Sequence, residues 1–421
     1  MPRVRAELGA PLVGVAPSGA WHPGPVSTAN DTSATDDPAA VPRRGGPPRG
    51  FLVPLAVVPA LLFGVPLWTV VLGGQGWPLG VRVAGIVLAV LAYAGLPLLM
   101  AAGHGRRRSD AAARVGDTLL GLAWLLFACS VLGLVLELVL LVAGTPGRER
   151  IVAYAVVAAW VLLVGYGLVE ALRVPRVRER EVVLDRLGPG LDGARVVVLT
   201  DTHFGPLDRT RWSERVAAVV RGLEPDLLVH AGDIADGDVA RRGGQARPMV
   251  ELTAPLGRFS IVGNHEHFSG AEQWVAHLRD LGWQVLVNAH AVVERGGDEL
   301  VVAGVDDPAG RGRPLSGGPD LDAALTGAAP DLPVLLLAHQ PSQVGAAVAA
   351  GVDLQVSGHT HGGQIWPFHL IVRLEQRALA GLSRRGERTQ LYTSRGTGFW
   401  GPPLRVFAPS EITVLVLRAG R

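Results

Sequence analysis

The sequence predicts a two-part protein, in which an α-helical membrane region of about four transmembrane helices precedes an α/β domain. Two observations lead to this fold class. Four long apolar runs follow one another between Phe51 and Leu172, and after Arg180 short apolar segments alternate with segments of helical periodicity. Runs of about 20 apolar residues are long enough to cross a bilayer as helices. Short strands that alternate with helices are typical of an α/β sheet.

The N-terminal segment, residues 1–50, is predicted to be a disordered tail. It is rich in Pro, Gly, Ala, Ser and Thr and has no apolar periodicity. Such a segment cannot bury enough apolar surface to offset the conformational entropy that is lost on ordering.

The membrane region is expected over residues 51–175. Its four apolar runs are Phe51–Gly73, Val81–Ala102, Thr118–Ala143 and Ile151–Leu172. One such run could be a buried core helix of a soluble protein, but four in succession leave no polar faces to solvate that fold. We therefore predict four transmembrane helices, then a juxtamembrane linker over residues 176–193 and the α/β domain over residues 194–421.

Arginine residues predict the orientation of these helices. Three loops or flanks are rich in arginine, namely those with Arg43, Arg44 and Arg49, with Arg106, Arg107, Arg108 and Arg114, and with Arg173, Arg176, Arg178 and Arg180. The other two loops hold only Arg148 and Arg150 between them. Because cytoplasmic loops carry the excess of basic residues, we expect a multi-pass protein of the cell membrane with the α/β domain in the cytoplasm. The alternative is export, since Arg43-Arg44 faintly resembles a twin-arginine signal.

Charge and cysteine content exclude some classes of function. The formal net charge is +2, but the basic excess lies before residue 176 and the remainder is slightly acidic. A nucleic-acid-binding domain would carry the basic excess itself, so we expect no nucleic-acid partner. The single cysteine, Cys129, lies in an apolar run, which argues against a disulfide framework, a cysteine metal site and a cysteine nucleophile.

Metal-capable side chains follow five of the predicted strands. The segments are TDTHFG, GDIAD, GNHE, LAHQP and GHTHGG, which supply Asp201, His203, Asp233, Asp236, Asn264, His265, His339, His359 and His361. Ligand sites of α/β sheets lie beyond the carboxyl ends of the strands. Carboxylate oxygens combined with imidazole nitrogens suit Mn, Fe or Zn, whereas an all-oxygen set would suit Mg or Ca. A lone histidine at a strand end is usually an ordinary polar residue, but an ordered series of five such motifs indicates a metal centre.

These motifs closely resemble the signature of the calcineurin-like metallophosphoesterases over roughly residues 194–418. The segments GHTHGGQIWPF and GTGFWGPPLRVFAPSEITVLVLR are similar to the bacterial membrane-associated branch of that family. The resemblance implies a four-layer α/β/β/α sandwich with two adjacent metal ions. It implies that Asp201, His203 and His361 hold the first metal, that Asn264, His339 and His359 hold the second, and that Asp233 bridges them. It also implies that His265 lies near the leaving group as a general acid or transition-state stabiliser, supported by Asp236.

The expected function is that of a membrane-anchored, binuclear metal-dependent phosphohydrolase. Its cofactors would be two divalent or trivalent metal ions, and a hydroxide that bridges them would attack phosphorus. The expected substrate is a phosphorylated small molecule or lipid, with a phospholipid or lipid head group as the first candidate. Two other readings stay open. One is a tethered phosphodiesterase for soluble substrates such as cyclic nucleotides, and the other is a non-catalytic membrane sensor or scaffold.

Two further features of the sequence have alternative interpretations. The segment over residues 369–388 mixes leucines with Arg373, Arg377, Arg384, Arg385 and Arg388. It is either an ordinary amphipathic surface helix followed by a loop, or a lip that touches the bilayer and binds anionic head groups. Glu137 lies inside the third apolar run, where a carboxylate is costly, and we expect it to face the interior of the bundle.

Overall fold

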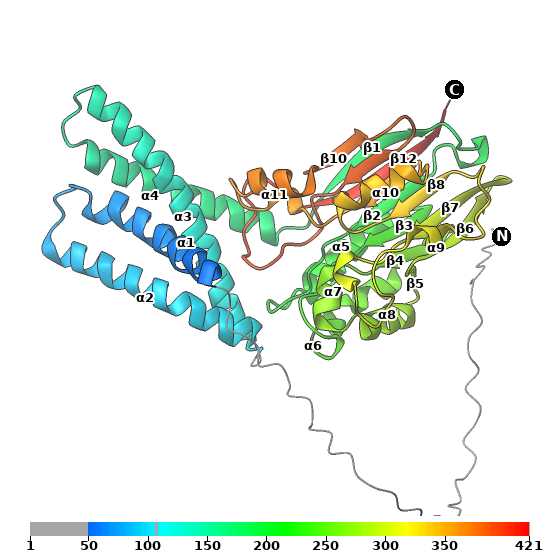
Figure 1. The fold of residues 1–421 in the computed structure, drawn as a ribbon, viewed down its shortest axis with the longest axis horizontal. Helices are drawn as coiled ribbons and strands as arrows, with labels where there is room; N and C mark the ends of the chain where they lie inside the picture. The colour runs from blue at the N-terminus through cyan, green and yellow to red at the C-terminus, as the bar shows by residue number, and fades with distance from the viewer. Residues whose placement is uncertain (1–48, 106–107, 421) are drawn as a thin grey trace, which may run out of the picture.

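The computed structural model describes residues 49–105 and 108–420, which form a helical bundle and a two-sheet domain (Figure 1). The predicted tail over residues 1–50 therefore lies outside the described residues, apart from Arg49 and Gly50 at the start of the first helix. Arg43, Arg44, Arg106 and Arg107, which contribute to the charge argument, also lie outside them.

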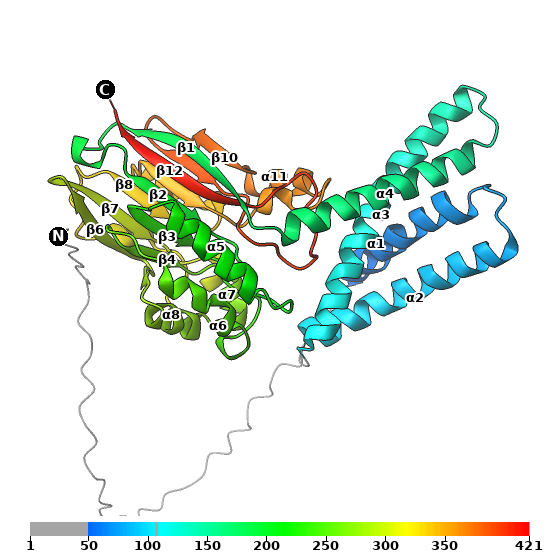
Figure 2. The same ribbon diagram turned by 180° about the vertical axis from the view of Figure 1, so that it is seen from behind.

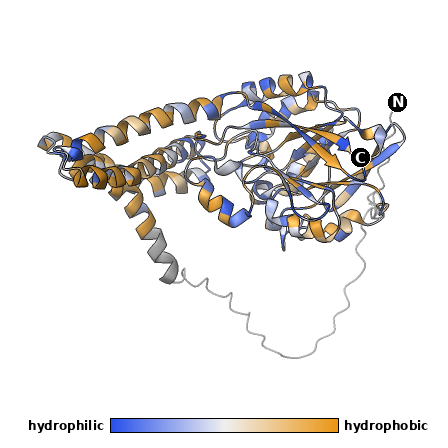
Figure 3. Ribbon diagram, turned by 90° about the horizontal axis from the view of Figure 1, so that it is seen from above, coloured by the Kyte–Doolittle hydropathy of each residue, from blue (hydrophilic) through white to orange (hydrophobic). Residues whose placement is uncertain are grey.

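The bundle consists of the helices α1 (Arg49–Leu67), α2 (Leu79–His104), α3 (Asp110–Val142) and α4 (Arg148–Leu172). A π-helical turn over Trp68–Leu72 continues α1. The last three helices are each long and apolar enough to cross a membrane, and the first supplies a shorter apolar stretch over Val57–Leu72. Apolar residues also cover the outside of the bundle (Figure 3), as a lipid-facing surface requires. The prediction of an apolar helical region of about four spans agrees with this arrangement.

The domain contains two six-stranded sheets. The strands of the first sheet are, in order across it, β1 (Arg176–Leu184), β12 (Glu411–Ala419), β2 (Arg195–Leu199), β3 (Leu227–Ala231), β4 (Arg258–Ile261) and β5 (Gln284–Val285). Those of the second are β10 (Gly381–Arg384), β11 (Gln390–Thr393), β9 (Leu354–Ser357), β8 (Val334–Leu337), β7 (Asp298–Gly304) and β6 (Ala289–Arg295). Strands β2 to β5 are parallel, as are β7, β8 and β9.

Three apolar cores show that the domain has four layers. The central core lies between the sheets and includes Val198, Val229, Leu335 and Val356. The outer face of the first sheet packs on α5 (Thr210–Gly222), α6 (Val239–Ala246) and α8 (Ala271–Asp280), whose residues form a second core with Val197 and Leu228. The outer face of the second sheet packs on α9 (Leu321–Leu325) and α10 (Val344–Ala349). Two short helices, α7 (Asn264–Ser269) and α11 (His369–Gln376), complete the domain. The predicted four-layer sandwich is confirmed.

The segment that we expected to be a juxtamembrane linker, residues 176–193, is part of the sandwich instead. Strand β1 pairs in parallel with β12 along its whole length, and the side chains of Val182 and Leu184 enter the central core. The middle of β1, Arg178 to Glu181, carries exposed Arg and Glu side chains, as is common for an edge strand. Because of this polar composition, the sequence alone predicted a linker instead of a strand.

The bundle is docked on the domain through apolar and ionic contacts. Leu125 of α3 packs with Ile365, Leu404 and Val406 of the domain. A Cβ atom on Gly121 of α3 would lie only 2.7 Å from Pro402, so the helix and the C-terminal loop approach closely. Near the start of α3, Arg242 and Arg241 of the domain donate to the carboxylate of Asp110, and Arg108 of the bundle donates to Asp238 of the domain. Only Arg173, Val174 and Pro175 separate α4 from β1 (Figure 2).

Candidate metal centre

Five parallel strands end at one edge of the sandwich, and the first metal-capable residue after each strand follows within three positions. The first sheet supplies Asp201 after β2, Asp233 after β3 and Asn264 after β4, and the second sheet supplies His339 after β8 and His359 after β9. Turns rather than regular strands carry these side chains. The alternation of apolar strand and polar turn in the sequence therefore corresponds to a single site between the carboxyl ends of both sheets.

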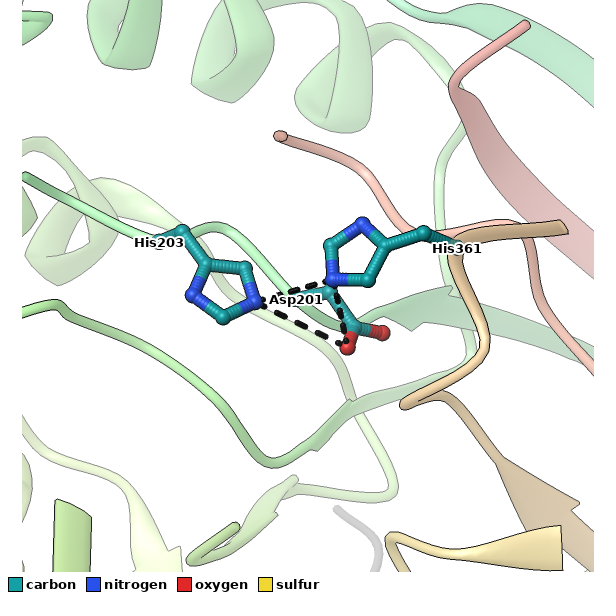
Figure 4. Close-up of side chains that lie close together, drawn as sticks. All are labelled: Asp201, His203 and His361. Carbon is teal, nitrogen blue, oxygen red and sulfur yellow. Dashed lines mark hydrogen bonds and ion pairs between the residues drawn. The ribbon is translucent and has the colours of Figure 1, made fainter. Parts of the chain in front are cut away.

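The first ligand group consists of Asp201, His203 and His361 (Figure 4). The Nε2 atoms of His203 and His361 are 3.0 Å apart, and the Nε2 atom of His361 is 3.4 Å from Oδ1 of Asp201. All three side chains are buried. Their donor atoms converge on one point, as a bound cation requires.

The second ligand group consists of Asp233, His339 and His359. The Nε2 atom of His339 lies 3.1 Å from Oδ2 of Asp233. The same Oδ2 atom is 3.6 Å from Nε2 of His203, so Asp233 lies between the two groups. The backbone N–H of His265 donates to the other oxygen of Asp233 over 3.0 Å, which holds the carboxylate in place.

A hydrogen-bonded triad lies beside the first group. Asp236 Oδ1 is 2.8 Å from Nδ1 of His203 and 2.7 Å from Nδ1 of His265. A carboxylate only accepts, so both rings carry a proton on Nδ1. The Nε2 lone pair of His203 is thereby directed toward the first ligand group, and Nε2 of His265 lies 4.0 Å from Asp233.

The donor atoms fit a pair of cations. Among the described residues, Asn264 Oδ1 and His339 Nε2 are buried without a hydrogen-bond partner. The Nδ1–H group of His339 donates to the backbone carbonyl of Ala231 over 2.8 Å. The Nε2 atom of the same ring faces the Asp233 carboxylate and carries either a proton or a lone pair. A lone pair that faces a carboxylate requires a cation between them. The mixture of imidazole, carboxylate and amide donors suits Mn, Fe or Zn.

One contact differs from this pattern. The Nη2 atom of Arg405 lies 3.1 Å from Nδ1 of His361. A guanidinium only donates, so this contact leaves the proton of the neutral His361 ring on Nε2. Coordination of a cation through Nε2 requires Arg405 to release Nδ1, and the same Nη2 atom of Arg405 also donates to the carbonyl oxygens of Arg395 and Gly398.

The backbone at the site is strained. Five of the expected ligands, Asp201, His203, Asp233, His359 and His361, have left-handed backbone conformations with φ between 43° and 68°. Residues other than glycine adopt this region rarely, at a cost of about 1–3 kcal/mol each, and they cluster at functional sites. Glycines allow the turns to approach one another: a Cβ atom on Gly358 would lie 2.1 Å from Asp201, and one on Gly263 would lie 2.2 Å from Asp233.

Burial and neighbouring charges set the pKa values of the triad. Burial lowers the pKa of His265, but the charges of Asp233 and Asp236 outweigh it and raise that pKa to about 10. Burial likewise opposes the ionisation of Asp236, but the imidazoles of His203 and His265 outweigh it and hold its pKa below the usual range. These neighbours favour the imidazolium form of His265 and the carboxylate form of Asp236.

Two residues that support the site had no role in the sequence analysis. Glu266 is fully buried, and its carboxylate accepts from the backbone N–H groups of Asp233, Ile234, Ala235 and Gly263. It thereby ties the GNHE turn to the GDIAD turn. The sequence signal for it was its place in the GNHE motif. Arg405 is also fully buried beside His361; it lies in the C-terminal segment GTGFWGPPLRVFAPSEITVLVLR, whose resemblance assigned it no role.

The comparisons with known proteins agree with this geometry. The family model for calcineurin-like phosphoesterases matches residues 194–363. A transmembrane protein with a metallophosphoesterase domain from Danio rerio is 36% identical over 66% of this chain, and the match spans 64% of that protein's length. A metallophosphoesterase from Helicobacter pylori is 36% identical over 64% of this chain and 72% of its own length. One from Aquifex aeolicus is 31% identical over 61% of this chain and 97% of its own length. The chain belongs to the calcineurin-like metallophosphoesterases.

Proposed function

We propose that this protein is a membrane-anchored, binuclear metal-dependent phosphohydrolase. The observation that carries the proposal is the pair of ligand groups at the edge of the sandwich, with the Asp233 carboxylate between them. In this proposal residues 51–175 anchor the chain, and the phosphoesterase domain comprises β1 together with residues 194–421.

The ligands divide between two cations. Asp201, His203 and His361 would hold the first cation, Asn264, His339 and His359 would hold the second, and Asp233 would contribute to both. When bound, the two cations would lower the pKa of a water molecule toward about 7 and neutralise charge on the phosphoryl oxygens.

A residue beside the cations would protonate the leaving group. Nε2 of His265 faces the shared carboxylate, and its Nδ1–H is held by Asp236, so this ring can donate a proton to the oxygen that leaves phosphorus. In this proposal water is the nucleophile, and the cysteine of the chain, Cys129, supplies no thiol to the site because it lies in α3 within the bundle.

The orientation of the protein follows from the arginine distribution. We place the domain on the cytoplasmic side of the cell membrane, with the helices crossing it several times. The substrate in this proposal is a phosphorylated molecule that is presented at the membrane surface, with a phospholipid or lipid head group as the first candidate.

Metal removal tests the proposal. Purified full-length protein should lose turnover of phosphate mono- and diesters in the presence of a chelator while the domain stays folded, because its three cores do not depend on the metal. Mn²⁺ should restore activity better than Mg²⁺, which prefers oxygen ligands in an octahedron. Full activity in excess chelator would contradict the two-metal proposal, and correct metal content without turnover of any ester would indicate a non-catalytic scaffold.

A further inference from the structure

A cavity of about 650 Å³ joins the candidate metal centre to the membrane helices. At one end it is lined by Asp236, His265 and His361 of the site. On the side of the membrane helices it is lined by Met100 of α2, by Leu120 and Trp124 of α3, and by His104 and Asp117, which pair with each other. Cavities of this size are typical of small-molecule sites, which are mostly apolar with a few polar groups at one end.

The apolar end of the cavity lies at the level where the bilayer core ends. The loops at residues 73–78 and 143–147 mark the bundle end far from the domain (Figure 1). A helix crosses the hydrocarbon core in about 20 residues, so the core that starts near Leu79 of α2 and Val142 of α3 ends near Leu98 and Leu122. Met100, Leu120 and Trp124 are within one turn of those positions. The cavity therefore opens where the acyl chains of a bilayer meet the domain.

Aromatic side chains border the cavity on the domain side. Phe268, Trp400 and Phe368 all line it, and they are 60%, 50% and 40% exposed. The rings of Phe268 and Trp400 each lie 5.8 Å from the His265 ring, and the Phe368 ring lies 5.9 Å from Trp124. Apolar surface thus extends from the proton donor of the site to the membrane helix. Exposed apolar surface of this kind marks a binding site for an apolar group or a membrane.

The arginines of the cavity have carboxylate partners within the described residues. Arg241 and Arg242 share the carboxylate of Asp110, and Arg108 pairs with Asp238. These ion pairs hold the three guanidinium groups at the wall of the cavity and compensate two of their three charges. Affinity for a substrate would come from the metal ligands at one end and from apolar surface at the other.

We infer that the cavity binds a phosphate ester whose organic group carries a hydrocarbon chain. This inference rests on the proposed function and names its substrate class. The phosphoryl group lies at the metal ligands, and the chain lies against Leu120, Trp124 and Phe368, continuous with the bilayer. Water adds to phosphorus, the P–O ester bond breaks, and the departing oxygen leaves with the proton of His265. The products are a phosphate or phosphate monoester and an alcohol.

A series of esters that differ only in chain length tests this inference. Full-length protein in zwitterionic nanodiscs is assayed with alkyl 4-nitrophenyl phosphates from methyl to dodecyl, and with the corresponding alkyl monophosphates. We expect kcat/KM to rise with chain length by roughly 10-fold or more, since each buried methylene adds to binding. Equal values for methyl and dodecyl esters would refute the inference and leave the proposed function intact. No turnover of any ester with metal restored would refute the proposed function itself.

Cavity-filling variants separate binding in the cavity from partition of the ester into the bilayer. Leu120→Trp on α3 and Val372→Trp on α11 add bulk to the lining of the cavity and should lower the dodecyl-to-methyl ratio of kcat/KM by roughly 10-fold. Val142→Trp is the matched control, because Val142 is 83% exposed at the far end of α3 and should keep the wild-type ratio. Partition concentrates the dodecyl ester equally for all three variants. An unchanged ratio in both cavity variants would overturn the inference.

Cross-linking gives a readout that does not depend on turnover. A long-chain alkylphosphonate with a terminal diazirine cannot be hydrolysed at its P–C bond and should label peptides that contain Leu120, Trp124 or Val372. Excess dodecylphosphonate should prevent the labelling, and excess methylphosphonate should not. Labelling confined to the outer faces of the helices, or labelling that dodecylphosphonate fails to prevent, would contradict the assigned cavity.

Discussion

Asp233 and His265 are in direct contact, since the backbone N–H of His265 donates to Asp233, but they have different predicted roles. Asp233 lies between the two ligand groups, so Asp233→Asn removes a charge that each cation needs and should lower metal content. His265 contacts Asp236 and faces the reacting region, so His265→Gln should retain both metals and lower mainly kcat. Loss of a positioned general acid costs about 10²–10⁴-fold in rate. The cost should be smaller for an ester of nitrophenol, which needs little protonation on leaving.

Metal analysis and rates on esters with good and poor leaving groups check both variants. If His265→Gln loses metal, or slows both kinds of ester equally, the proton-donor assignment is wrong. If Asp233→Asn keeps two metals with wild-type affinity, Asp233 is not the shared ligand.

At the scale of elements, the arginine-rich segment over residues 369–388 folds as a short helix and a strand. Helix α11 ends at Gln376, and β10 then pairs with β11. Arg373, Arg377, Arg385 and Arg395 line a second cavity of about 510 Å³, and among the described residues none of the four pairs with a carboxylate. Arg384 and Arg388, which the sequence also placed in the lip, line no part of it. Leu370, Ile371 and Leu374 of α11 are exposed beside this arginine cavity.

We predict that the arginine cavity binds the head group of an anionic lipid. An arginine at the surface of an anionic membrane contributes about 1 kcal/mol, so Arg373→Gln with Arg377→Gln should weaken the preference for anionic over zwitterionic nanodiscs by roughly 30-fold. Arg384→Gln with Arg388→Gln is the matched control, since it removes the same charge outside the cavity. The measurement is the ratio of rates, at low and high salt, in nanodiscs of the two compositions. An equal loss in both double variants would point to net charge and contradict a head-group site.

At the scale of the whole molecule, two of the three arginines at the far end of the bundle have structural partners. Arg150 donates to the carbonyl oxygens of Gln75 and Gly76, and Arg148 pairs with Glu149, while Arg82 lies exposed in the first turn of α2. The flanks on the domain side carry more arginines than this end does. A reporter that is active only in the cytoplasm should therefore function when it is fused after Arg421. Activity of a reporter specific for the opposite side of the membrane would contradict the charge argument and favour export.

Much of the fold and of the candidate site can be predicted from local sequence patterns. The apolar runs and the strand-ending motifs depend on neighbouring residues, and each motif follows an apolar strand that the sequence shows directly. Partnerships between distant segments leave no such pattern. The polar edge strand β1 is recognisable only by its partner β12, which lies more than two hundred residues later in the chain. Arg405 and the cavity at Trp124 likewise depend on how the C-terminal loop packs against α3 and α4.

The position of β12 between β1 and β2 has a consequence for biosynthesis. The first strand after the membrane helices has its partner in the last strand of the chain. Until Glu411–Ala419 has been translated, β1 remains unpaired and β2 exposes an open edge. Synthesis proceeds at roughly 5–20 residues per second, so the interval between Arg176 and Glu411 lasts on the order of 10–50 s. During that interval the helices are already inserted beside the translocation machinery, but the central core between the two sheets is incomplete. Ribosome stalling late in the message would therefore leave a membrane-tethered chain with an unpaired, aggregation-prone sheet edge.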